Sequence, residues 1–286
     1  MSSPEIERLR EETRKQWSDQ KTTAARSKWY PKLAVFLRGA TQAIVEAAGL
    51  RPGLEVLDLA SGMGEPALSV AAAIVPGGCL TATDIDAGIL AAAEENAAAR
   101  GLSNLVFRLV DAEALPFPDR SFDRITCRFG VMFFADHLKA LREARRVLKP
   151  RGRAVYVVWG PADQPVYAAT VGVLEKYVQP PPRDPDAPHP FRFSVPGKLC
   201  RALAQAGFEE AHEEERPITM VWDGPPEEYW QQFAEAAAPF RPLIDALPAE
   251  RRDRAVREIV ASLGRYADAG QMKIPGVITV GTGIRG

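Results

Sequence analysis

The residues best suited to chemistry are two glycines and the carboxylates near them. Gly62, Gly64 and Ala67 match the pattern G-x-G-x-x-A, and Asp84 lies twenty residues beyond Gly64. In an α/β protein such glycines make a tight turn between a strand and a helix, and an acidic residue at this distance accepts the hydroxyls of a ribose. The alternative is that the glycines serve only the turn, but the position of Asp84 argues against it. The spacing therefore predicts a site for a ligand that contains a nucleoside.

The charges around the loop favour one of two ligands that the spacing leaves open, a nicotinamide dinucleotide and S-adenosylmethionine. Asp58 precedes the loop and Glu65 lies within it. A dinucleotide would place its pyrophosphate on the loop, where carboxylates would repel it. S-adenosylmethionine has no phosphate and carries a sulfonium and an ammonium group, which carboxylates attract. The sequence therefore favours S-adenosylmethionine, with an NAD(P)-dependent oxidoreductase as the alternative.

The elements that must position these residues alternate between strands and helices. The strands are expected at 55–60, 79–85, 104–110, 122–130 and 153–159. The connecting helices have recognisable starts: Pro66 in a first turn, Asp86 and Asp136 as N-caps. Strands separated by helices imply parallel βαβ units, and a ligand then binds at the carboxyl ends of the strands.

Flanking segments are expected to cover that edge of the sheet. An exposed helix (4–25), an amphipathic helix (29–49), a short helix (166–178) and a further helix (196–208) are predicted, with late strands at 211–222 and 276–282. Residues 160–196 carry nine prolines and are otherwise expected to be irregular. We expect a lid (1–50), a ligand-binding domain (51–160 and 196–286) and two cap insertions that set the substrate (161–195 and 226–270). Lid and cap are expected to become ordered when the ligand binds.

Four stretches resemble a known family: EVLDLASGMGEPAL, TATDID, VDAEALPFPDRSFDRITC and LREARRVLKPRGR. They are similar to the class I S-adenosylmethionine-dependent methyltransferases, above all the ubiquinone-type and small-molecule group. The resemblance is specific over about 50–160 and weaker over 196–286. It implies a Rossmann-like α/β fold with a seven-stranded, mainly parallel sheet, helices on both faces and an antiparallel seventh strand. The chain departs from the family at Ala60, often glycine, at Met63, often threonine, and at Arg151, usually glycine.

The same resemblance implies which residues hold the cofactor. Asp58 would lie near its amino group, Asp84 would hold the ribose, and Ile85 would pack on the adenine. Asp111 would accept from the adenine amino group, and Ala112 would offer a backbone N–H. The other residues implied at the cofactor are the loop residues Ala60, Ser61, Gly62 and Gly64, the backbone of Arg128 and Phe129, and Trp29 of the N-terminal segment.

Aromatic residues are the candidates for an acceptor pocket. Phe133 and Phe134 follow a strand at the ligand edge, and Trp17 and Tyr30 belong to the lid. Packing of the core or of the lid is the alternative role for each of them. The opposite wall is expected from the later insertion, with candidates Trp222, Tyr229, Trp230 and Phe233.

Two histidines are candidates for a general base. Methyl transfer from a sulfonium depends mainly on alignment, and a base matters when the acceptor is a hydroxyl. His189 lies in the proline-rich cap, and His137 begins a helix near the ligand edge. Each has a structural alternative, as a bystander or as part of the first helical turn. The resemblance implies methyl transfer to oxygen, nitrogen, sulfur or carbon of a small molecule, and a non-catalytic S-adenosylmethionine-binding protein is a further alternative.

The composition narrows the class of protein. Of 286 residues, 46% are hydrophobic and 26% are charged, and the net charge of −1 does not predict a nucleic-acid partner. No apolar run approaches the ~20 residues of a membrane span, and residues 1–20 lack a signal-peptide core. The three cysteines are too far apart for a disulfide framework or a metal site. We expect a cytoplasmic enzyme without a metal or a membrane partner, and the sequence does not predict its oligomeric state.

Overall fold

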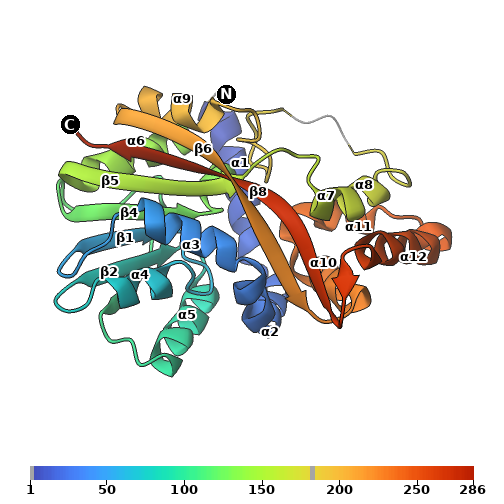
Figure 1. The fold of residues 1–286 in the computed structure, drawn as a ribbon. Helices are drawn as coiled ribbons and strands as arrows, with labels where there is room; N and C mark the ends of the chain where they lie inside the picture. The colour runs from blue at the N-terminus through green and yellow to red at the C-terminus, as the bar shows by residue number, and fades with distance from the viewer. Residues whose placement is uncertain (1–2, 181–183) are drawn as a thin grey trace.

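The computed structural model describes residues 3–180 and 184–286, and Figure 1 shows their fold. Residues 1–2 of the predicted lid and 181–183 of the predicted cap lie outside the described ranges. Within these ranges the strands form one sheet in the order β3-β2-β1-β4-β5-β8-β6, and the short β7 pairs with β8. The strands are β1 (Glu55–Leu59), β2 (Cys79–Asp84), β3 (Leu105–Leu109), β4 (Phe122–Arg128), β5 (Leu148–Trp159), β6 (Glu209–Asp223), β7 (Ala267–Asp268) and β8 (Gln271–Ile284).

The pairing of the strands explains where a ligand can bind. Strands β3, β2, β1, β4 and β5 pair in parallel, whereas β8 runs antiparallel to both β5 and β6. The chain order reverses beside β1, which pairs with β2 on one side and β4 on the other. Such a switch point leaves a crevice at the carboxyl ends of the strands. The predicted α/β fold and its antiparallel late strand are confirmed.

Helices cover both faces of the sheet and one of its ends (Figure 1). The helix α3 packs with α4, and α6 packs with α9. The helices are α1 (Ser3–Trp17), α2 (Gln20–Phe36), α3 (Arg38–Ala47), α4 (Ala67–Ala73), α5 (Ala87–Ala99), α6 (His137–Val147), α7 (Pro165–Ala169), α8 (Val171–Leu174), α9 (Lys198–Gln205), α10 (Pro226–Ala236), α11 (Arg241–Asp245) and α12 (Ala249–Gly264), with 3₁₀ turns η1 (Val131–Phe133) and η2 (Ala238–Phe240). None of the helices in the described ranges is long and apolar enough to cross a bilayer.

The insertion between β6 and β8 packs onto the rest of the chain. Its helix α10 contacts α2, and α12 contacts α7 and α8. Phe233 and Phe240 of the insertion belong to the same buried cluster as Val155 and Tyr156 of β5. The predicted helical insertion is confirmed as helical, and it shares a core with the sheet.

Several predicted boundaries are wrong. The expected helices 4–25 and 29–49 are three helices, because Asp19 accepts from Thr22 N at 2.8 Å and so caps a new helix at Gln20. A second break falls at Leu37, where apolar spacing continues but the helix ends.

Three further boundaries differ from the prediction. Pro66 precedes the helix α4 as its N-cap and does not lie in its first turn. The strands β5 and β8 begin earlier than predicted, at Leu148 and Gln271, because their pairing partners extend them.

Candidate active site

A cavity of about 330 Å³ lies where the carboxyl ends of β1, β2 and β4 face α1, α2 and α10. Its volume is at the lower end of the range for small-molecule sites. The lining includes residues from both predicted groups, those at the cofactor and those at the acceptor. They are Ala60, Ser61, Gly62, Asp84, Ile85, Asp111, Ala112, Arg128 and Phe129 from the first group, and Trp17, Tyr30, Phe133 and Phe134 from the second.

The glycine loop is the turn between β1 and α4. Gly62 and Gly64 have φ of 55° and 115°, and a Cβ at Gly64 would lie 2.8 Å from Leu68 Cδ1. Glycine is therefore required at Gly64 both for the backbone angle and for the close approach of α4. Ala60, which replaces a glycine common in the family, also has a positive φ of 53°. This strained alanine stands at the end of β1, at the cavity wall.

Asp84 at the end of β2 is held in place by backbone amides. Its Oδ1 accepts from Ile85 N at 2.8 Å and Asp86 N at 3.2 Å, and its Oδ2 accepts from Gly62 N at 3.0 Å. Burial raises the pKa of this carboxyl, and the nearby guanidinium of Arg26 opposes the shift. Each carboxylate oxygen can accept more than one hydrogen bond, so both remain able to accept from a ligand.

Asp58 lies beneath the loop and does not line the cavity. It is fully buried; its Oδ1 accepts from Thr126 Oγ1 at 2.5 Å, and its Oδ2 has no hydrogen-bond partner among the described residues. Burial raises the pKa of Asp58 to about 7. A buried carboxylate oxygen without a donor is a group that a cationic ligand above it would stabilise.

Glu65 differs from its predicted role as a free negative charge. Its Oε1 pairs with Arg100 Nη1 at 2.6 Å, and its Oε2 accepts from Ser69 Oγ at 2.7 Å. The backbone oxygen of Glu65 also accepts from Arg128 at 2.9 Å. The loop is therefore less negative than the sequence suggested, because arginines distant in the chain converge on it.

The adenine end of the predicted site is covered by α1. Asp111 Oδ1 accepts from Glu113 N at 2.9 Å, and Arg14 Nη2 lies 3.4 Å from Asp111 Oδ2. Glu113 is buried and accepts from Arg10 Nε at 3.2 Å and from Asp136 N at 3.0 Å. Arg10, Arg14 and Glu113 were not among the residues predicted from the sequence to form the site. The available signal was the opposite charge of two segments, basic at positions 10 and 14 and acidic at positions 111 and 113.

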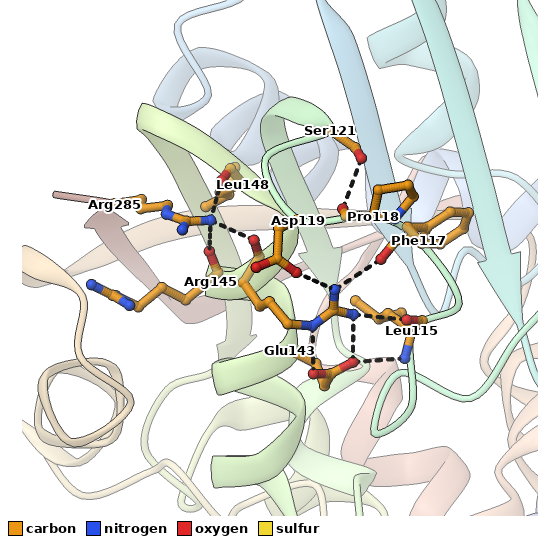
Figure 2. Close-up of polar contacts among 10 residues, drawn as sticks. Leu115, Phe117, Pro118, Asp119, Ser121, Glu143, Arg145, Leu148 and Arg285 are labelled. Atoms are coloured by element: carbon orange, nitrogen blue, oxygen red, sulfur yellow. Dashed lines mark hydrogen bonds and ion pairs between the residues drawn. The ribbon is translucent and has the colours of Figure 1, made fainter.

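The segment after Glu113 is anchored to α6 by one guanidinium, whose partners are shown in Figure 2. Arg146 donates to both oxygens of Glu143, to the carbonyls of Leu115 and Phe117 and to Asp119, each at 2.8 Å. A planar, multiply donating group is suited to fix a loop in this way. These contacts hold in place the loop that follows Asp111 and Glu113 and joins them to β4.

Residues 38–181 match the sequence profile of the ubiE/COQ5 methyltransferase family. The chain belongs to this family. The match confirms the predicted class, the S-adenosylmethionine-dependent methyltransferases, and with it the predicted cofactor.

Curated relatives carry the likeness beyond the profile. The chain is 35% identical over 183 residues to the ubiquinone/menaquinone biosynthesis C-methyltransferase UbiE of Xanthomonas campestris, covering 59% of this chain and 71% of that protein. It is 41% identical over 110 residues to UbiE of Cellvibrio japonicus, covering 38% of this chain and 44% of that protein. The chain spans about half the length of most of these relatives.

Solved structures agree on the fold. YcgJ of Bacillus subtilis is 23% identical with a TM-score of 0.56, covering 87% of this chain and 100% of that one. The [4+2]-cyclase SpnF is 26% identical with a TM-score of 0.51, covering 86% of this chain and 79% of that one.

Beyond the predicted cofactor residues, the cavity is lined by aromatic rings, which form what we call the aromatic lobe. Phe129 stacks on Trp159 with ring centroids 4.3 Å apart, and Trp17 meets Phe133 edge-on at 4.9 Å. The insertion contributes Phe233, which lines the cavity as predicted.

The rest of the predicted opposite wall is divided. Tyr229 lines the cavity, whereas Trp222 and Trp230 do not. Trp222 is buried in the core, where its ring packs against Phe36 and Tyr229.

Two polar groups within this lobe were not predicted as hydrogen-bonding groups. Tyr30 OH is buried without a partner among the described residues, and burial raises the pKa of this phenol to about 12. Gln232 of α10 lines the cavity, is 6% exposed, and has no hydrogen bond within the described part of the chain. Both are positioned to meet a polar group on an otherwise apolar ligand.

Both candidate bases lie outside the cavity lining. His137 packs edge-on against Phe193 at 5.5 Å, and burial lowers its pKa to about 4. His189 packs against Phe191 and Phe240, and its Nδ1 accepts from Phe191 N at 3.2 Å. The sequence predicted them near the ligand edge, because His137 follows a strand that ends there and His189 lies in the proline-rich cap. In the structure their rings pack against neighbouring phenylalanines.

Trp29 and Gly64 are also absent from the lining. The Trp29 ring lies 5.9 Å from that of Trp222, and its Nε1 donates to Glu235 at 2.7 Å. The structure therefore places Trp29 outside the cavity lining, in the packing that joins α2 to α10.

Proposed function

We propose that this chain transfers a methyl group from S-adenosylmethionine to a small aromatic acceptor of the quinone type. The observation that carries the proposal is the continuity of the cavity. The predicted cofactor residues at the carboxyl ends of β1 and β2 open directly onto the aromatic lobe. The names of the curated relatives, which specify ubiquinone and menaquinone biosynthesis, support an aromatic acceptor.

The residues around the loop fit the cofactor. Asp84 would accept the ribose hydroxyls, Ile85 would pack on the adenine, and Asp111 with Ala112 would meet its polar edge. Asp58 beneath the loop would stabilise the positive charges of the methionine part. When bound, S-adenosylmethionine supplies an electrophilic methyl group on sulfur.

The chain itself supplies alignment and exclusion of water. The lobe is lined by rings of Phe129, Phe133 and Phe233, which favour a flat apolar acceptor over a charged one. The phenol of Tyr30, with its raised pKa, is neutral near pH 7 and can donate a hydrogen bond. Neither histidine lines the cavity, so we propose that the acceptor enters with its nucleophilic atom already reactive, and that proximity supplies most of the rate.

The test is turnover on a panel of acceptors. The chain is incubated with S-adenosylmethionine and a naphthoquinol, a catechol or an aromatic amine, and adenosylhomocysteine and methylated product are quantified. We expect product with the quinol, and at limiting S-adenosylmethionine at least about tenfold less product with the Asp84→Ala variant. Cofactor binding without turnover on any acceptor would favour the non-catalytic alternative. The cytoplasmic location and the lack of a nucleic-acid partner remain predictions.

A further inference from the structure

Four arginines line the cavity, and one of them has no ionic or hydrogen-bonded partner in the described part of the chain. Arg10 pairs with Glu113, and Arg14 pairs with Asp111. Arg128 donates to Thr41 Oγ1 and to a carbonyl of the glycine loop. Arg26 of α2 has neither kind of contact within these ranges.

The position of Arg26 relates it to the cofactor half of the cavity. Its guanidinium carbon lies 4.9 Å from the centroid of the Trp17 ring. Its Nη2 would lie 3.5 Å from a Cβ placed on Gly62. The group therefore lies over the glycine loop, stacked on one aromatic face.

The nearest carboxylates already accept hydrogen bonds from other groups. Asp84 is occupied by three backbone amides. Asp86 accepts from the hydroxyl of Thr23 and from the amides of Gly88 and Ile89. Both carboxylates attract Arg26 electrostatically without accepting a hydrogen bond from it. Burial lowers the pKa of the guanidinium.

A largely buried guanidinium without an acceptor is costly, and its planar fork suits a carboxylate or a phosphate. S-adenosylmethionine carries one anionic group, the carboxylate of its amino-acid part. We infer that Arg26 binds this carboxylate and so selects cofactors that retain the amino-acid part. The inference rests on the proposed function. It also means that α2, a part of the predicted lid, would contact the ligand, because Arg26 belongs to α2 and lies over the glycine loop.

The test compares two ligands by calorimetry. Adenosylhomocysteine has the carboxylate, and 5′-methylthioadenosine keeps the adenosine but lacks the whole amino-acid part. In Arg26→Gln we expect adenosylhomocysteine to bind at least about tenfold more weakly, the range for a lost charged hydrogen bond, with methylthioadenosine unchanged. The affinity of Arg26→Lys for adenosylhomocysteine should lie between those of the parent and of Arg26→Gln. An ammonium group keeps the charge attraction but cannot donate two parallel hydrogen bonds to a carboxylate. Lys21→Gln, which removes an exposed charge from the same helix, is the matched control.

Each other outcome has a distinct meaning. Equal weakening of both ligands, with a lower melting temperature, would give Arg26 a structural role and overturn the inference. Unchanged adenosylhomocysteine affinity with a raised KM for the acceptor would assign Arg26 to the acceptor instead. Failure of the parent chain to bind adenosylhomocysteine would overturn the proposed function itself. Binding of NADP that Arg26→Gln abolishes would show that the fork takes a 2′-phosphate, which would overturn both.

Discussion

At the scale of single residues, Asp84 is preorganised before any ligand arrives. Three backbone amides fix its carboxylate, so a ribose meets acceptors that need no reorientation. We expect Asp84→Ala to weaken adenosylhomocysteine binding at least tenfold, because hydrogen bonds to a carboxylate contribute about 1.5–3 kcal/mol each. Calorimetry measures the affinity, and circular dichroism checks the fold. Unchanged affinity would remove Asp84 from the ribose site.

Asp58 should make cofactor binding depend on pH. Its pKa of about 7 means that its charged form, which attracts the sulfonium and ammonium groups, grows as the pH rises from 6 to 8. We expect the affinity for S-adenosylmethionine to rise up to about tenfold over this range. Asp58→Asn should bind more weakly at pH 8 and lose the dependence. A pH profile that survives in this variant would assign it to another group.

The same residue affects stability in the opposite direction. Because the pKa of Asp58 in the folded chain lies above the ordinary value of 3.8 for an aspartate, the folded chain binds an extra proton between about pH 4 and 7. The contribution of Asp58 to stability without ligand is therefore fully present below about pH 4 and is lost as the pH rises to about 7. Asp58→Asn should therefore have a higher melting temperature than the parent at pH 8. In the parent, the buried charge of Asp58 lowers stability but favours binding of the cofactor.

At the scale of elements, the contacts of Arg146 hold the segment that follows β3. Arg146→Lys loses the fork to Glu143 and leaves the carbonyls of Leu115 and Phe117 with fewer donors. We expect the free energy of unfolding to fall by about 1–3 kcal/mol, measured by urea denaturation. Arg142→Lys, on the exposed side of the same helix, is the control and should change little. Equal effects in both variants would refute a specific role for the cluster in Figure 2.

The helix α1 is held over the cavity by a buried carboxylate. Glu113→Gln keeps an acceptor for Asp136 N but removes the ion pair with Arg10. Amide exchange in α1 should become roughly tenfold faster, since a charged hydrogen bond is lost. Asp119→Asn is the control, because Asp119 belongs to the same segment but pairs with Arg146 of α6.

Adenosylhomocysteine should slow amide exchange in lid and cap together. We expect added protection in 10–30 and in the described part of 161–195, along with the loop 58–65. Protection confined to the loop would show that the lid does not respond to the cofactor.

At the scale of the whole molecule, the cofactor should stabilise the fold, because the cavity proposed to hold it is lined by the sheet, the N-terminal helices and the insertion. At a hundredfold excess over the dissociation constant, adenosylhomocysteine should add about 2.7 kcal/mol. That corresponds to a rise in melting temperature of roughly 5 °C for a chain of this size. NADH at equal concentration should leave it unchanged. The reverse pattern in a thermal shift assay would favour the oxidoreductase alternative.

Local patterns and chain order determined much of the fold, and they determined which of the predicted cofactor residues share one cavity. Alternating strands and helices, with glycine and acidic residues at strand ends, specify parallel units whose carboxyl ends share one edge. That logic brings Gly62, Asp84, Asp111 and Phe129 to one cavity, as the structure shows. It fails at boundaries such as Asp19, whose side chain caps a new helix inside the segment 4–25 that was predicted to be one exposed helix.

Only the tertiary structure decided where several of the side chains point. The rings of Trp29, His137 and His189 turn into packing, and Glu65 is neutralised by Arg100 from a helix 35 positions away. Arg26 reaches the loop from a separate segment. Such contacts depend on how distant elements dock, and docking is set by burial and shape across the whole core, which no local pattern of residues encodes.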